Sequence, residues 1–173
     1  AFTRGPIDRV FADGGITRRE NPRYEIGDAR TFVAGRVESA IRRWFRVGGG
    51  AGVEEVSFGG ASDRLTRAEA AVTIDTRVDP AFPRNALQAT FGIERLAFDA
   101  GEATRRKADV SGFLGLPGQS VLAVRALSLT ASAPLPAYEQ ALLGGAATVR
   151  GYDLGYQAGD NLAAVSTELR LPI

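Results

Sequence analysis

The sequence contains no cysteine and no histidine, and these two absences exclude several kinds of functional site. Without cysteine there is no disulfide framework and no thiolate metal site. Without histidine there is no serine–histidine triad and no imidazole ligand for a metal ion. Glu54, Glu55 and Glu69 are the remaining candidates for acid–base or metal chemistry, and nothing in the sequence sets their geometry. We therefore expect no catalytic residue, no metal site and no cofactor.

A large charge imbalance is also missing. The 173 residues carry 21 basic and 20 acidic side chains, for a net charge of +1, and Lys107 is the only lysine among the basic residues. A nucleic-acid-binding domain shows a basic excess, so nucleic acid is not an expected partner. No apolar run approaches the roughly 18 residues of a membrane-spanning helix. The length is that of one domain.

Alternation of apolar and polar residues predicts β-strands along most of the chain. In residues 86–98, Leu87, Phe91 and Ile93 alternate with Gln88 and Glu94. Glycine- and proline-rich turns separate eight such stretches, and no stretch predicts a helix. The other seven stretches are residues 6–19, 31–43, 43–58, 67–78, 105–116, 120–127 and 161–173, of which the first is the least regular. The predicted fold class is all-β.

The predicted strands are long, about 10 to 14 residues. Strands of soluble proteins usually have about five or six residues, whereas a tilted strand that spans a bilayer needs about 9 to 11. The polar faces carry charges of both signs, and the apolar faces are small and aliphatic. This pattern favours an antiparallel transmembrane β-barrel, with lipid outside and a wet lumen inside. A soluble β-sandwich that acts as a lipid-binding module, with its apolar faces packed inward, remains an alternative.

The alternation also predicts which side chains share a face. One face is expected to point outward, to lipid, and carries Val72, Ile74, Leu87, Phe91, Ile93, Val165 and Leu169. The other is expected to face the lumen and carries Asp75, Arg77, Gln88, Glu94, Arg125 and Glu168. We interpret the charges among these as solvated lumenal groups that pair loosely. A selectivity ring in a passive outer-membrane porin or channel is the alternative interpretation.

The glycine-rich stretch near the C-terminal end carries the most specific motif. Pro136 and Glu139 precede Leu143-Gly144-Gly145, and then comes Val149-Arg150-Gly151-Tyr152. After Gly159 a predicted strand ends in Glu168-Leu169-Arg170-Leu171-Pro172. In this order and spacing, the region resembles the outer-membrane assembly and translocation barrels. This bacterial surface antigen family includes the barrel subunit of the Bam complex, the Tam-system barrel and the two-partner secretion transporters.

The resemblance implies a role for the segment from Pro134 to Asp160. In the family it is a long loop that folds back into the barrel lumen, with its Arg-Gly-aromatic tip against the inner wall. The loop-docking residues are then Val149, Arg150, Gly151, Tyr152, Gly144 and Gly145, with Glu168 as the candidate lumenal partner. A guanidinium group suits this because it can bind a carboxylate in a fork, and glycines allow tight turns beside it. Arg150 as an ordinary solvated loop arginine is the alternative.

The resemblance also implies a location and an activity. Residues 1–173 are expected to be a partial outer-membrane barrel domain, about eight strands of a sixteen-stranded barrel. The C-terminal closing strands and the N-terminal POTRA domains of the family are expected to be absent from it. The expected function is to insert or secrete substrate proteins at the bacterial outer membrane, through β-augmentation and without a cofactor. The expected partners are the lipid bilayer, the substrate proteins and periplasmic accessory proteins.

Overall fold

The structure, a computed structural model, describes residues 7–171 and contains ten β-strands and two short 3-10 helices. The strands are β1 (Arg9–Asn21), β2 (Ile26–Arg42), β3 (Phe45–Phe58), β4 (Ala61–Asp75), β5 (Ala86–Phe98), β6 (Gly101–Gly115), β7 (Val121–Ala131), β8 (Ala141–Leu143), β9 (Gln157–Gly159) and β10 (Leu162–Arg170). The helices are η1 (Pro117–Gln119) and η2 (Ala137–Glu139). No helix among these residues is both long and apolar enough to cross a membrane.

Eight strands form one antiparallel sheet in the order β1-β2-β3-β4-β5-β6-β7-β10, and β8 pairs with β9 in a separate hairpin. The predicted all-β class is confirmed, and each of the eight predicted stretches overlaps one strand of the large sheet. The sheet is not closed, because β1 and β10 are its two edges and do not pair with each other.

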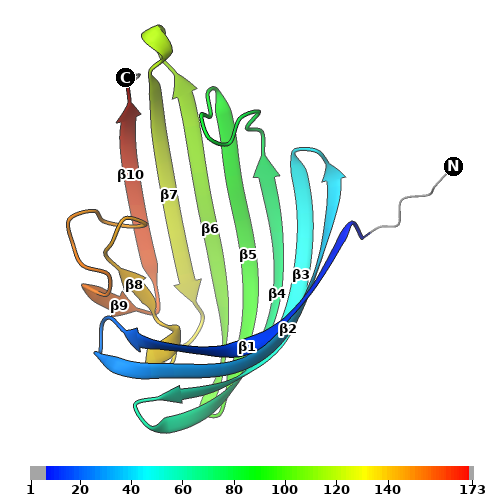
Figure 1. Ribbon diagram of the computed structural model, residues 1–173, viewed down its shortest axis with the longest axis vertical. Helices are drawn as coiled ribbons and strands as arrows, with labels where there is room; N and C mark the ends of the chain where they lie inside the picture. Colours follow the sequence, from blue (N-terminus) through cyan, green and yellow to red (C-terminus); the bar gives the residue numbers. More distant parts are fainter. Residues whose placement is uncertain (1–6, 172–173) are drawn as a thin grey trace, which may run out of the picture.

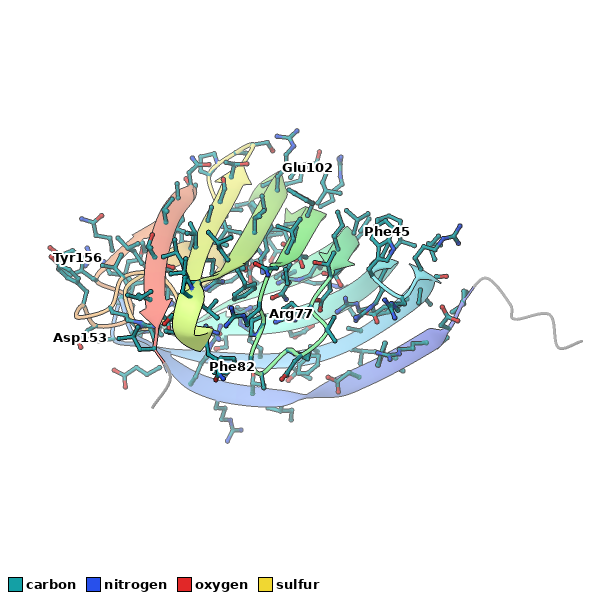
Figure 2. All side chains as sticks on the ribbon, turned by 90° about the horizontal axis from the view of Figure 1, so that it is seen from above. Phe45, Arg77, Phe82, Glu102, Asp153 and Tyr156 are labelled. Carbon is teal, nitrogen blue, oxygen red and sulfur yellow. The ribbon has the colours of Figure 1, made fainter. Side chains whose placement is uncertain are left out.

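The sheet is strongly curved and has two different ends (Figure 1). At the lower end in Figure 1, tight turns join β1 to β2, β3 to β4 and β5 to β6, and residues 132–161 connect β7 to β10. The turns at the upper end are residues 43–44, 76–85 and 116–120. The β1–β2 hairpin sweeps across the lower end toward β8 and β9. Seen from above, the curve has an inner face, and Arg77 lies over its hollow while Glu102 lies outside (Figure 2).

Side chains alternate between the inner and outer faces, as the sequence pattern predicts. On β5, Leu87, Phe91 and Ile93 are exposed on the outer face, and Gln88 and Glu94 are half-buried on the inner face. The register carries the same division across the sheet, because directly opposed residues share a face. Val72 and Ile74 of β4 oppose outer-face residues of β5, while Val165 and Leu169 of β10 oppose outer-face residues of β7.

The hydrophobic core is small and lies on the inner face at the lower end. Val56, Leu65, Leu96 and Ala103 come from four adjacent strands, and Leu135 of the β7–β10 connection packs onto them. The core therefore joins the connection to the sheet.

The glycine stretch of β3 forms neither a kink nor a bulge. Gly48 to Gly52 pair in unbroken register with both neighbouring strands, and the register shift of this hairpin lies at Ala40 and Arg42. Instead, the absence of side chains at these glycines lets β3 lie close to the backbone of the neighbouring strand. A Cβ atom at Gly50 would lie 2.8 Å from the carbonyl oxygen of Gly35 on β2.

Candidate functional site

Residues 132–161, here called the docking segment, cover the lower end of the inner face. The segment also reaches the β1–β2 turn at the far side of the sheet. Arg23 donates a hydrogen bond from Nη1 to the carbonyl oxygen of Tyr156 at 3.0 Å, and Tyr24 donates one to Gln140. Gly155 lies so close to this turn that a Cβ atom there would be 2.8 Å from the amide nitrogen of Arg23. The segment thus bridges the two sides of the curved sheet at this end.

The segment is anchored by one buried carboxylate, that of Glu139, which is only 6% exposed. Arg30 donates to its Oε1 at 2.9 Å, Arg67 lies 3.3 Å from the same atom, and Arg105 lies 3.1 Å from its Oε2. A buried charge must be paired, and three guanidinium groups meet that requirement here.

Three further carboxylates balance the guanidinium groups. Asp28 binds Arg30 at 2.9 Å, and Glu94 binds Arg67 at 2.7 Å and Arg105 at 2.6 Å. Glu54 lies 3.2 Å from Arg30 and 3.4 Å from Arg67. Together these groups form the Glu139 network: Asp28, Arg30, Glu54, Arg67, Glu94, Arg105 and Glu139. Every buried side-chain nitrogen and oxygen in residues 7–171 has a hydrogen-bond partner.

The sheet brings the network together through its register. Its members lie on the inner faces of β2 to β6, one or two to a strand. Glu94 and Arg105 are directly opposed across β5 and β6. Glu139 is the one member from outside the sheet, and η2 presents it.

Tyr138 is the second anchor of the docking segment. Its hydroxyl donates to Asp63, its carbonyl oxygen accepts from Arg30 at 2.7 Å, and the Arg30 guanidinium lies 5.5 Å from the centre of its ring. Burial raises the pKa of the Tyr138 hydroxyl well above its usual value, and the Asp63 carboxylate raises it further. The hydroxyl therefore stays protonated and remains a donor.

The Arg-Gly-Tyr motif lies at the exposed part of the same segment. Arg150 reaches the predicted partner, with its Nη2 3.4 Å from Oε2 of Glu168, but its side chain is 74% exposed. Val149 is half-buried. Tyr152 is exposed and packs against Tyr156 in a tilted arrangement, with ring centres 4.6 Å apart. The buried anchor of the segment is thus Tyr138-Glu139, and the docking role of the Arg-Gly-Tyr tip stays a prediction.

The glycines of the motif fold the segment on itself. Gly144, Gly145 and Gly151 all have positive φ angles, of 116°, 73° and 89°. The Gly145 amide donates to the carbonyl oxygen of Tyr152 at 2.8 Å. Gly144 is the tightest position, because a Cβ atom there would overlap the carbonyl oxygen of Asp153.

The other predicted lumenal charges lie on the inner face in separate pairs. Asp75 binds Arg77 at 2.9 Å near the upper end, and this hydrogen bond is the main reason that the pKa of Arg77 is raised. Arg125 binds Asp109 at 2.8 Å and also donates to the carbonyl oxygen of Ala147 in the docking segment at 3.0 Å. Glu94 belongs to the Glu139 network. These charges are therefore paired more closely than the expected loose lumenal pairing.

Sequence reasoning included Glu139 only as part of the motif and passed over Asp28, Arg30, Arg67 and Arg105. A signal for them exists. Once the strands are aligned in register, arginines and carboxylates alternate across the inner face at one end of the sheet. No group of residues among those described has the arrangement of a metal site.

The outer face carries a continuous apolar band from β2 to β10. Its larger members are Val33, Val37, Val53, Val72, Leu87, Phe91, Ile93, Val110, Leu114, Val124, Val165 and Leu169. Toward the lower end, β2 to β7 change to polar outer-face residues, which are Thr31, Glu55, Thr66, Arg95, Arg106 and Ser128. On β10 the lowest outer-face residue is Ala163, which is apolar and lies opposite Ser128.

Comparisons of this chain with models of known protein families, with curated proteins and with solved structures find no match.

We predict that Glu139→Gln destabilises the fold far more than a matched change at the surface. The substitution keeps the shape but removes the negative charge that pairs with one buried guanidinium group, Arg30, and two half-buried ones, Arg67 and Arg105. Loss of a buried pairing of this kind costs about 3–5 kcal/mol. Glu102→Gln is the control, because its ion pair with Arg95 is more than 60% exposed on both sides and is worth about 0–1 kcal/mol. Denaturant unfolding of both variants in detergent measures the difference. Equal losses would show that the network does not stabilise the fold.

We also predict that Gly144→Ala opens the docking segment. Gly60→Ala is the control, because Gly60 also has a positive φ angle, has no atom within 4 Å of the added Cβ, and lies away from the Arg150–Gly151 bond that trypsin cleaves. The control carries only the backbone cost of about 1–3 kcal/mol, whereas Gly144→Ala must also move the Asp153 backbone. Tryptic cleavage after Arg150, timed for each variant, reports the opening. If both variants are cleaved at the same rate, close packing at Gly144 does not hold the segment.

Proposed function

We propose that this chain is part of an outer-membrane β-barrel that assembles or translocates other proteins, with its outer face in lipid and its inner face around a wet lumen. The activity needs no cofactor. The docking segment holds the lumen side of the barrel in one shape while substrate strands are guided past it.

One observation carries the membrane part of the proposal: the lower boundary of the apolar band is staggered. We compare each strand from β4 to β7 with the strand before it. In every case its first polar outer-face residue lies directly opposite the last apolar outer-face residue of the preceding strand. The four opposed pairs are Thr66 with Val53, Arg95 with Ala68, Arg106 with Ile93, and Ser128 with Ala108. The boundary thus advances by two residues at each of these four steps from one strand to the next.

A flat membrane surface that cuts tilted strands produces such a stagger. From β2 to β3 the boundary does not move, because Thr31 lies opposite Glu55. Over the five steps from β2 to β7 the advance averages about 1.6 residues per strand, which corresponds to a tilt of roughly 45–50°. Membrane barrels have strand tilts of about 35–45°. A soluble sheet covered by a protein partner has no reason to keep this order.

The inner face supports the assembly part. Its charges are held in ion pairs, and the docking segment lies across them, as the resemblance to assembly and translocation barrels leads us to expect. A passive channel needs an open path with a constriction, whereas here the lower end of the inner face is covered by a folded segment.

The lipid contact is tested by single cysteines, which the chain allows because it has none of its own. Val165 and Ser166 are neighbours on β10, both exposed, on the outer and inner faces respectively. In vesicles we expect a membrane-impermeant maleimide to label Ser166→Cys and to spare Val165→Cys. After the vesicles are dissolved and the protein is unfolded, both must react. Equal labelling in intact vesicles would contradict the membrane assignment.

The activity is tested in the same vesicles with a chemically unfolded outer-membrane barrel protein as substrate. We expect folding and membrane insertion of the substrate to be several-fold faster than in empty vesicles, without ATP. Glu139→Gln should remove the acceleration while Val165→Cys in the same background stays protected. A steady ion conductance without any acceleration would identify a passive channel instead.

A further inference from the structure

A shallow furrow crosses the outer face over β6, β7 and β10. Its volume is about 350 Å³, and it is lined mainly by small residues: Ala108, Val110, Ala126, Ser128, Ala163 and Val165. The furrow exists because alanines form its floor where the neighbouring strand β5 carries Phe91 and Ile93.

A cation without an acidic partner stands at the lower end of this furrow. Arg106 precedes Ala108 on the same face of β6, about 7 Å along the strand. It is exposed, and within residues 7–171 no hydrogen bond or ion pair joins it to another side chain. The nearest outer-face charges, Arg95 and Glu102, are bound to each other at 2.7 Å.

Two hydroxyl groups stand beside Arg106. Thr130 is directly opposite it on β7, and Ser128, one outer-face position further on, opposes Ala108. A guanidinium group next to hydroxyl donors matches the oxygens of a phosphate. The apolar furrow begins where these donors end.

We propose that this surface binds one phosphate-bearing membrane lipid. Arg106 and Thr130 contact the phosphate, and an acyl chain lies in the furrow across Ala108, Ala126 and Ala163. The site fits a lipid better than a free anion, because the donors and the furrow are continuous. It also lies where a lipid headgroup would be, since Arg106 is part of the staggered boundary. The inference rests on the proposed membrane location.

Native mass spectrometry of the protein, released from detergent micelles with added lipid, tests the site. The probes are phosphatidylglycerol and a neutral glycolipid with the same acyl chains. We expect the wild-type protein to retain phosphatidylglycerol in preference to the glycolipid. Arg106→Gln should weaken phosphatidylglycerol binding about tenfold, the usual effect of one charged hydrogen bond. Ala126→Phe, which fills the furrow, should weaken binding of both lipids.

The control is Arg95→Gln, which removes an arginine from the same boundary and should leave lipid binding unchanged. Equal losses in the Arg95 and Arg106 variants, or none in the Arg106 variant, would overturn the site. Displacement of the lipid by millimolar glycerol phosphate would also overturn it, because that result indicates a simple anion site. Failure of the membrane proposal is seen separately, as labelling of Val165→Cys in intact vesicles.

Discussion

The pairing of one buried carboxylate with three guanidinium groups governs the arrangement of the lower half of the molecule. The Glu139 carboxylate is removed from water and cannot remain there without compensation. The arginines that compensate it come from β2, β4 and β6, so these strands must hold their relative curvature for all three to reach it. The same contact fixes the connection between β7 and β10 on the inner face. The position of the connection and the curvature of the sheet therefore depend on the same ion pairs.

The need to pair several carboxylates explains why arginine is preferred to lysine in this chain. The chain uses arginine almost to the exclusion of lysine. A planar guanidinium group can bind two or three carboxylates in fixed directions, as Arg30 does with Asp28, Glu54 and Glu139. A lysine ammonium group is a flexible point charge and would not hold several carboxylates in fixed directions. The outer face has no such network of ion pairs, since its small aliphatic side chains require only apolar surroundings.

The sequence predicted the sheet well and the site poorly, for one physical reason. Strand alternation is a local property, so the bounds of β5 and the faces of Phe91 and Glu94 follow from the residues nearby. The Glu139 network is non-local, because it includes a direct contact between residues 109 apart along the chain, Arg30 and Glu139, and its members become neighbours only through the register. The β8–β9 hairpin was missed because its two strands have three residues each and show no measurable alternation. Arg150 attracted attention as a motif, while the buried anchor lay eleven residues earlier.

The contact between the β1–β2 turn and the docking segment has a consequence for the order of folding. Arg23 and Tyr156 are 133 residues apart, whereas the hairpins of the sheet form from residues close in sequence. Local hairpins close quickly. Closing a long loop is slower, because the chain loses conformational entropy before the new contacts can offset that loss. We therefore expect the segment to dock after the hairpins have formed, with Arg30 and Arg67 hydrated until then. The lower end of the sheet is then open to water for as long as the segment is undocked.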